Sequence, residues 1–380
     1  MPSTGEHTQA AIAVPRFSIP FIPTRGFAEA VAQRRSWIHS VYIALGEPSG
    51  LDARLTLTRW DLDRLVDTLS ALKGLPVYAL LNGRWIHPRQ YLTLESLPAL
   101  CRTLERLIVD IDLAGLVFAD LYFLSALGSA SPQIAGRLEA VPSVNFMLDS
   151  VTKAESVITA IARTPFRRPD RLILDRSLNR DADALKGVCR QLRSRYPDMA
   201  VGLLANEGCL FHCPFKGAHD ALIAMAQQAP AGDLLHRLNR DLGCIAQLEN
   251  RPADLLRSPF IRPEDAAAYA PPAHFIKLCG RTLGQAFVIA TLDAYIQGRF
   301  HGNLLDILDA PAALRDRLVI PNHRFPETFH NTVTRCDKAC AVCGYCDAVF
   351  AEIGRWQTAP LAPLMPKPVP GAGAERLQTT

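Results

Sequence analysis

The sequence lacks several features that mark membrane and nucleic-acid-binding proteins. Its 380 residues contain no stretch of the roughly 18 uninterrupted apolar residues that a membrane span requires. With 41 basic and 37 acidic residues, the net charge is only +4, which does not favour a dedicated nucleic-acid or membrane-surface protein. The N-terminus has no basic patch followed by an apolar run, so we expect no signal peptide and a cytoplasmic location.

Ten cysteines are present, and they are unevenly distributed. In a reducing cytoplasm, closely spaced cysteines point to metal or redox chemistry rather than to disulfides. Four lie in Arg335–Cys346 with the spacing C-x3-C-x2-C-x2-C, and two more form a C-x3-C pair at Cys209 and Cys213. Such spacings bring together the thiolates that a 4Fe-4S cluster or a tetrahedral zinc ion requires. Cys101 and Cys189 stand alone in helical segments, and we interpret them as buried hydrophobes.

Seven cysteines from two distant segments are candidate metal ligands. They are Cys209, Cys213, Cys244, Cys336, Cys340, Cys343 and Cys346. They allow one or two 4Fe-4S clusters, with zinc as the alternative and Cys279 open as a further ligand. Iron–sulfur is favoured because the candidate ligands are cysteines and because the first pair follows a predicted strand. The C-x3-C-x2-C order also occurs in radical-SAM enzymes, but there the barrel follows the cysteine loop, whereas this loop comes near the end of the sequence.

Short apolar runs alternate with amphipathic segments along most of the chain. The runs are near-continuously apolar, as expected for parallel strands that are covered on both faces. They are Val41–Leu45, Val77–Leu81, Leu116–Asp120, Val144–Leu148, Leu172–Asp175, Ala200–Asn206 and Phe275–Leu278. Helices are expected between them, for example at Leu57–Leu72 and Ala182–Tyr196. This series favours a TIM-like (β/α) barrel, which accommodates about eight units, over an open doubly wound sheet.

These patterns divide the chain into four parts. Residues 15–310 are predicted to form the barrel, and residues 311–357 a cysteine-rich C-terminal extension. Residues 1–14 are small and polar, and residues 358–380 are rich in proline, alanine and glycine, so we expect both to be disordered. No G-x-G-x-x-G follows the first apolar run, which weakens a dinucleotide-binding interpretation.

Polar residues follow several predicted strands, at the end of a barrel where active sites lie. The candidate substrate-binding residues are Asn82, Asp120, Asn206, Glu207, Arg262, Lys277 and Arg281. Helix capping or loop solvation is the competing explanation for any one of them. Arg262, Lys277 and Arg281 could form a positive pocket for a substrate carboxylate or phosphate. Pro263, followed by two carboxylates, equally suits the start of a helix.

The order of these segments resembles that of the collagenase-like peptidases, a family of unassigned mechanism (U32). Seven segments match family strands in the right order, over roughly residues 17–306. They are Phe17–Pro23, SVYIALG (Ser40–Gly46), VYALLN, LVFADL, VNFMLDSVTKAE, RLILDRSLNRD and AVGLLANEGC, followed later by KLCGR. The last two place Cys209 as the first cluster cysteine and Lys277, Gly280 and Arg281 in a K-I-x-G-R-like strand.

The resemblance implies a barrel with a 4Fe-4S cluster on four cysteines. Some members take part in oxygen-independent hydroxylation of ubiquinone precursors, and others in hydroxylation of RNA bases. The resemblance therefore implies an oxidoreductase that acts on a small aromatic, isoprenoid or nucleobase substrate with an electron donor or partner subunit. A metal-stabilised binding or scaffold subunit and a peptidase stay open, although the sequence shows no nucleophile with a positioned base. Unlike RNA-modifying relatives, the chain shows no appended RNA-binding module.

The chain departs from the family pattern at and near its cysteines. Val201 replaces an acidic residue, and the gap between Cys209 and Cys213 is shorter than the family's. Cys279 replaces the glutamate of K-I-E-G-R, and the four C-terminal cysteines are additional. We therefore expect cluster ligation to be rearranged relative to the family.

Overall fold

The computed structural model describes residues 15–45, 51–53, 61–87, 96–226, 234–270 and 272–357. The two terminal segments that are predicted to be disordered lie outside these ranges, as does the first part of the predicted helix Leu57–Leu72. Within the described ranges, no helix is both long enough and apolar enough to cross a membrane.

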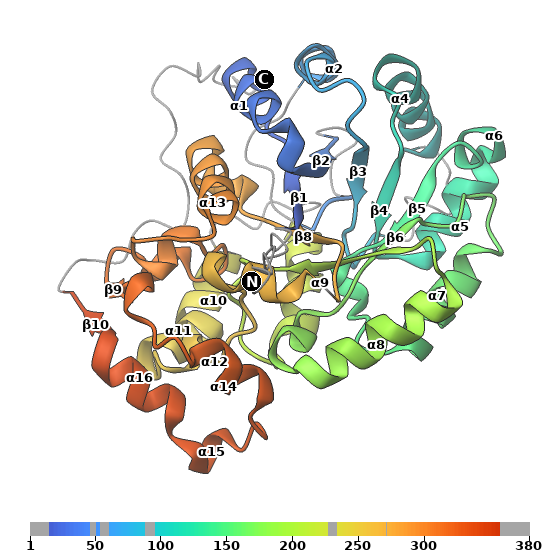
Figure 1. Cartoon of the computed structure of the whole chain (residues 1–380). Coiled ribbons are helices and arrows are strands. Elements are labelled where there is room, and N and C mark those ends of the chain that lie inside the picture. The colour runs from blue at the N-terminus through green and yellow to red at the C-terminus, as the bar shows by residue number, and fades with distance from the viewer. Residues whose placement is uncertain are drawn as a thin grey trace, which may run out of the picture.

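Eight parallel strands form one sheet that curls into a TIM-like barrel, with helices around it (Figure 1). The strands are β1 (Arg16–Pro20), β2 (Ile38–Ala44), β3 (Val77–Leu81), β4 (Gly115–Phe118), β5 (Glu139–Pro142), β6 (Arg171–Ile173), β7 (Ala200–Leu204) and β8 (Phe275–Lys277). Their order, β5-β4-β3-β2-β1-β8-β7-β6, places β1 beside β8. Between β5 and β6, Arg167 N donates to the Leu138 carbonyl at 3.0 Å, and Ala140 N donates to the Arg167 carbonyl at 3.1 Å. The predicted barrel is confirmed.

Helices surround the barrel and continue into the C-terminal part of the chain. Around the strands lie α1 (Arg25–Gln33), α2 (Leu62–Ser70), α4 (Ser96–Ile111), α5 (Leu121–Ala130), α6 (Pro132–Ala135), α7 (Val151–Ile161), α8 (Ala182–Arg195) and α13 (Gln285–Gln297). The other helices are α9 (Lys216–Ala226), α10 (Leu234–Asp241), α11 (Cys244–Asn250), α12 (Asp254–Arg257), α14 (Phe329–Arg335), α15 (Cys340–Cys343) and α16 (Tyr345–Ile353). A two-stranded antiparallel sheet joins β9 (Leu318–Val319) to β10 (Arg355–Trp356). Helix α8 begins where predicted, because Asp181 accepts a hydrogen bond from Ala184 N at 2.9 Å.

One predicted strand is wrong in position. The sequence predicts a strand at Val144–Leu148, but the strand that joins the sheet is β5, and Val144–Phe146 forms a 3-10 helix. Met147 has a φ of 51°, a left-handed conformation that an extended strand cannot contain. The apolar run therefore follows the strand and forms the turn that leads into α7.

Two large apolar cores and two smaller apolar clusters hold the molecule together. The larger core fills the space between the sheet and its helices and includes Phe17, Ile43 and Leu104. The second core joins Leu255 and Leu256 of α12 to residues such as Phe329, Val349 and Ile353. The cysteine-rich segment therefore packs against α11 and α12 rather than standing apart, and Figure 1 shows these helices side by side with α14 and α16.

Candidate functional site

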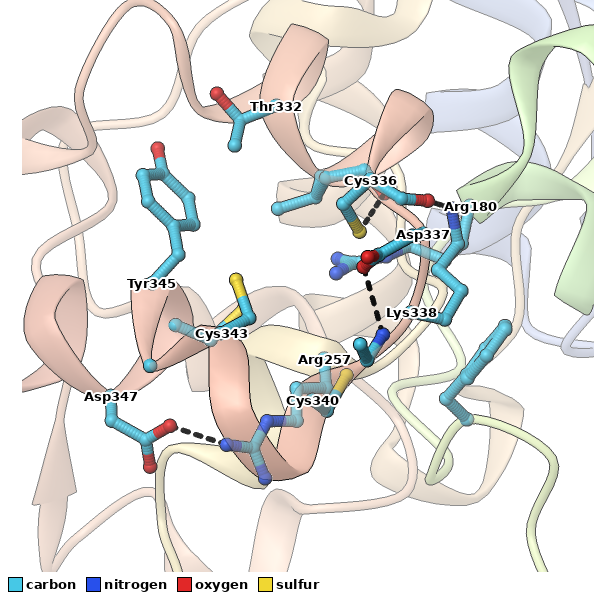
Figure 2. A pocket seen from close by; sticks show the side chains of 15 residues that line it. Arg180, Arg257, Thr332, Cys336, Asp337, Lys338, Cys340, Cys343, Tyr345 and Asp347 are labelled. Atoms are coloured by element: carbon cyan, nitrogen blue, oxygen red, sulfur yellow. Dashed lines mark hydrogen bonds and ion pairs between the residues drawn. The ribbon is translucent and has the colours of Figure 1, made fainter.

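The four C-terminal cysteines lie around one pocket at the edge of the second core. Cys336 follows α14, Cys340 and Cys343 lie at the two ends of α15, and Cys346 lies in the first turn of α16. All four line the same pocket (Figure 2). Gly344, with a φ of 66°, makes the left-handed turn between α15 and α16 that lets so short a segment surround the pocket.

The four thiols differ in their exposure to solvent. Cys346 is buried, Cys336 and Cys340 are half-buried, and Cys343 is exposed. Burial raises the pKa of the Cys346 thiol, while the nearby positive charges of Arg180 and Arg257 act in the opposite direction. Throughout the part of the chain that the structure describes, no three His, Cys, Asp or Glu side chains are already grouped around one metal position. The donor set fits a 4Fe-4S cluster or a zinc ion, either of which would draw these sulfur atoms together.

The other candidate cysteine ligands lie outside this pocket. Cys209 and Cys213 follow β7, and Cys244 begins α11. Cys213 and Cys244 are half-buried against the second core. Burial, with a smaller contribution from nearby Cys213, raises the pKa of Cys244 to about 11. Phe211, which lies between the first two cysteines in sequence, reaches the lining of the four-cysteine pocket.

Asn206 ties the ends of β7 and β8 together. It is fully buried, and its Nδ2 donates to the carbonyls of Cys279 at 3.0 Å and Ile307 at 3.1 Å. Its Oδ1 accepts from Cys279 N at 2.8 Å and lies 3.3 Å from the Cys279 thiol. These bonds use the donors and the acceptor of the amide, so the observed contacts give Asn206 a positioning role at the barrel mouth.

Lys277 and Arg281 lie near each other at the end of β8. Lys277 is buried, with its ammonium 4.1 Å from the centre of the Tyr42 ring. Burial lowers the pKa of Lys277 to about 8, while Cys279 acts in the opposite direction. Arg281 forms an ion pair with Asp52. The two cations therefore share the barrel mouth with an aromatic ring and one carboxylate.

Arg262 forms an ion pair with a carboxylate close to it in sequence. Its guanidinium forms a two-pronged ion pair with Asp265, at 2.8 and 3.0 Å, and lies 4.8 Å from the centre of the Phe325 ring. Pro263 begins a 3-10 helix (Pro263–Tyr269) that carries Asp265 in its first turn. The helix-start interpretation of this segment therefore accounts for the position of Arg262.

Asp120 and Asn82 bind main-chain groups near their own strands. Asp120 is the N-cap of α5, and its Oδ1 accepts from Tyr122 N at 2.8 Å and from Phe123 N at 3.1 Å. Asn82 Oδ1 accepts from Ala53 N at 3.0 Å and so fixes the segment that carries the partner of Arg281. Helix capping thus accounts for Asp120, and loop anchoring accounts for Asn82.

The structure pairs Glu207, a residue selected from the sequence, with a charged residue that was not selected, and it adds a second charged group nearby. Glu207 forms a buried ion pair with Arg176, the first residue of the 3-10 helix η3 (Arg176–Arg180). Lys216, at the start of α9, donates to Asn145 Oδ1 at 3.1 Å and to the Asp220 carboxylate at 2.7 and 2.9 Å.

Two local sequence signals bear on these added residues. Arg176 directly follows a predicted strand, and this position is the signal that would have placed it among the candidate site residues. Asn145 was not selected because it fell inside the wrongly placed strand prediction at Val144–Leu148, and not after the end of a strand. Burial lowers the pKa of Lys216, and the charge of Arg176 acts in the same direction.

Comparison with known proteins gives a limited set of likenesses. No family model matches the chain. The chain is 29% identical over 177 residues to a protein of Methanocaldococcus jannaschii named an uncharacterized protease. That alignment covers 46% of this chain and 50% of the relative, so the chain spans about half the length of the relative. A solved structure described as a U32 peptidase matches 60% of this chain and 85% of that chain, with 19% identity and a TM-score of 0.42.

Proposed function

We propose that this chain is an iron–sulfur oxidoreductase of the U32 family, with a 4Fe-4S cluster in the four-cysteine pocket and a small substrate at the barrel mouth. The observation that carries the proposal is that Cys336, Cys340, Cys343 and Cys346 line one pocket. Four thiolates are the donor set of such a cluster. When bound, the cluster would relay electrons one at a time, and hydroxylation of an aromatic, isoprenoid or nucleobase substrate would remove two electrons from it and take the oxygen atom from water or an oxygen-donor co-substrate.

The charges of the pocket support an anionic group within it. Arg180 and Arg257 both line the pocket. A cluster on four thiolates carries net negative charge, and a cationic side chain at its border stabilises that charge to the extent that carboxylates do not already neutralise it. Cys209, Cys213 and Cys244 stay candidates for a second cluster, which would need a fourth ligand.

The position of η3 supports communication between the pocket and the barrel mouth. Arg176, at its start, pairs with Glu207 at the end of β7, whereas Arg180, at its end, lines the cysteine pocket. A 3-10 helix rises about 2 Å per residue, so the two ends of η3 are about 8 Å apart along its axis. One short element therefore connects the two parts of the proposed site.

The side chains of the barrel mouth favour a small anionic or aromatic substrate. Lys277 and Arg281 could bind a carboxylate or phosphate, and Tyr42 offers a ring face beside Lys277. Asp52 balances part of this charge. In this proposal Lys277 and Arg281 orient the substrate, and Asn206 holds the ends of β7 and β8 in register beneath it.

A peptidase is the second candidate, because the Methanocaldococcus jannaschii relative is named a protease. A nucleophilic thiol requires a neighbouring base. The thiol of Cys279 lies 3.3 Å from the amide oxygen of Asn206, which is not a base that can take its proton. Lys277, whose pKa is lowered to about 8 and which interacts electrostatically with Cys279, is the group that would have to act as the base in a cysteine peptidase.

Anaerobic purification of the full chain tests the proposal. Iron, acid-labile sulfide and zinc are measured per chain, and the dithionite-reduced protein is examined by electron paramagnetic resonance. We expect a brown protein with iron and sulfide in equal amounts, four of each per cluster. Colourless protein with stoichiometric zinc would contradict the proposal and favour a metal-stabilised binding or scaffold subunit. Hydrolysis of casein that survives removal of the iron would favour the peptidase.

A further inference from the structure

Arg180 is a buried cation whose neighbours are mostly uncharged. It is 4% exposed and lies where η3 leads towards α8. Its Nη1 donates to the carbonyls of Leu256 at 2.8 Å and Ser258 at 3.4 Å. Among the residues that the structure describes, no carboxylate forms an ion pair with Arg180. A charge this deeply buried is costly unless a negative group balances it.

The groups that could balance this charge are thiols of the four-cysteine pocket. Arg180, Cys336 and Cys346 line the same pocket, and both thiols lie within electrostatic range of the Arg180 guanidinium. Cys346 Sγ also lies 4.0 Å from the Leu256 carbonyl, the same oxygen that binds Arg180. Figure 2 shows Arg180 at the border of the pocket, beside Cys336.

Arg257 lines the same pocket but has a different electrostatic setting. Its Nη1 pairs with Asp254 at 2.5 Å, and its Nη2 pairs with Asp347. Two carboxylates therefore already balance its charge. The pocket thus offers two arginines at its border, only one of which depends on the thiols for compensation.

We propose that Arg180 is a positioning residue that stabilises the cluster's thiolate ligands through Cys346 and raises the cluster's reduction potential. This inference rests on the proposed 4Fe-4S cluster. Reduction adds one electron from an external donor to the cluster, forms and breaks no bond, and makes the cluster more negative by one charge. A fixed cation beside it, in surroundings of low dielectric constant, favours the reduced form, so losing that cation makes reduction harder.

The test compares the two arginines in anaerobically purified full-length protein. Arg180→Gln removes the charge but keeps an N–H donor, Arg180→Lys keeps the charge, and Arg257→Gln is the matched control. Reduction potentials are measured by dye-mediated dithionite titration followed by electron paramagnetic resonance. For Arg180→Gln we expect the equilibrium constant for reduction to fall at least about tenfold, the scale of one charged hydrogen bond. Tenfold is about 59 mV for one electron. Arg257→Gln and Arg180→Lys should each change the constant less than about threefold.

A wild-type potential in Arg180→Gln, or an equally large shift in Arg257→Gln, would overturn the inference. Folding of each variant is checked by circular dichroism. If Arg180→Gln does not fold, Arg180→Lys decides the matter, because a tenfold change despite the retained charge contradicts the electrostatic role. Wild-type protein without an iron–sulfur cluster would refute the proposed function itself. If the wild type holds a cluster and Arg180→Gln does not change its reduction potential, only this inference is refuted.

Discussion

Glu139 provides a quantitative test of the barrel's electrostatics. It lies buried at the start of β5, at the N-terminal end of the barrel and away from the proposed site. Its Oε2 accepts from the Tyr78 hydroxyl at 3.3 Å, and its Oε1 lies 3.3 Å from Nη2 of Arg167. Burial, together with the nearby Asp170 carboxylate, raises the pKa of Glu139 to about 7.

The direction of the pH effect follows from that shift. A carboxyl group whose pKa is higher in the folded state stabilises the fold while it is protonated, and that stability is lost as the pH rises through the folded-state pKa. A rise from 4.5 to about 7 corresponds to about 3 kcal/mol. The pKa of Asp170 is lowered, so Asp170 stays ionised above pH 5 and adds no slope there.

Glu139→Gln removes the titrating group and keeps its approximate shape. Urea unfolding followed by circular dichroism gives the free energy of unfolding between pH 5 and pH 8. We expect the wild type to lose about 3 kcal/mol relative to the variant across this range. The control is Glu155→Gln, which removes a partly exposed carboxylate that pairs with Arg195 at 2.5 Å and should leave the wild-type slope unchanged. Parallel wild-type and Glu139→Gln curves would refute the reasoning.

Three further substitutions test local features. Asn206→Ala removes the bonds that join β7 to β8 and should lower the free energy of unfolding by about 2–4 kcal/mol in urea titrations, so a loss below about 1 kcal/mol would contradict the positioning role. Asp120→Ala removes the N-cap of α5 and should cost about 1 kcal/mol, whereas unchanged stability would remove the capping explanation. Gly208 has a φ of 72°, and a Cβ there would lie 2.8 Å from Cδ of Pro311. Gly208→Ala should lower thermal stability by about 1–3 kcal/mol, and an unchanged melting temperature would argue against the strain.

Strands with both faces buried could be predicted from continuous apolar runs in the sequence. Strand β5 is a case in which this pattern does not identify the strand. VYALL, the sequence of β3, is apolar throughout, and the strand has the predicted bounds. The sequence of β5, EAVP, contains a glutamate and a proline, while the more apolar VNFML follows it directly. The apolar run was therefore the stronger pattern, although the sheet uses its neighbour. Burial of Glu139 depends on tertiary contacts that a local pattern does not contain.

The same limit applies to the site. The short cysteine spacings predict that Cys336 and Cys346 lie close together, because few residues separate them. Nothing local marks Arg180 among 41 basic residues, since its environment is built by Leu256 and Ser258, far along the chain. Arg262 illustrates the converse, because its ion-pair partner Asp265 lies only three residues further along the chain and was visible in the sequence.

The most direct test of the central claim is the cluster content of a variant that disrupts the four-cysteine pocket. Iron and sulfide per chain, with the electron paramagnetic resonance signal of the reduced protein, are compared between wild type and Cys336→Ser/Cys340→Ser. The control is Cys101→Ser/Cys189→Ser, which alters cysteines remote from the pocket lining. We predict that the pocket variant loses four iron and four sulfide per chain while the control keeps the wild-type content. Full iron content and an unchanged signal in the pocket variant would contradict the account.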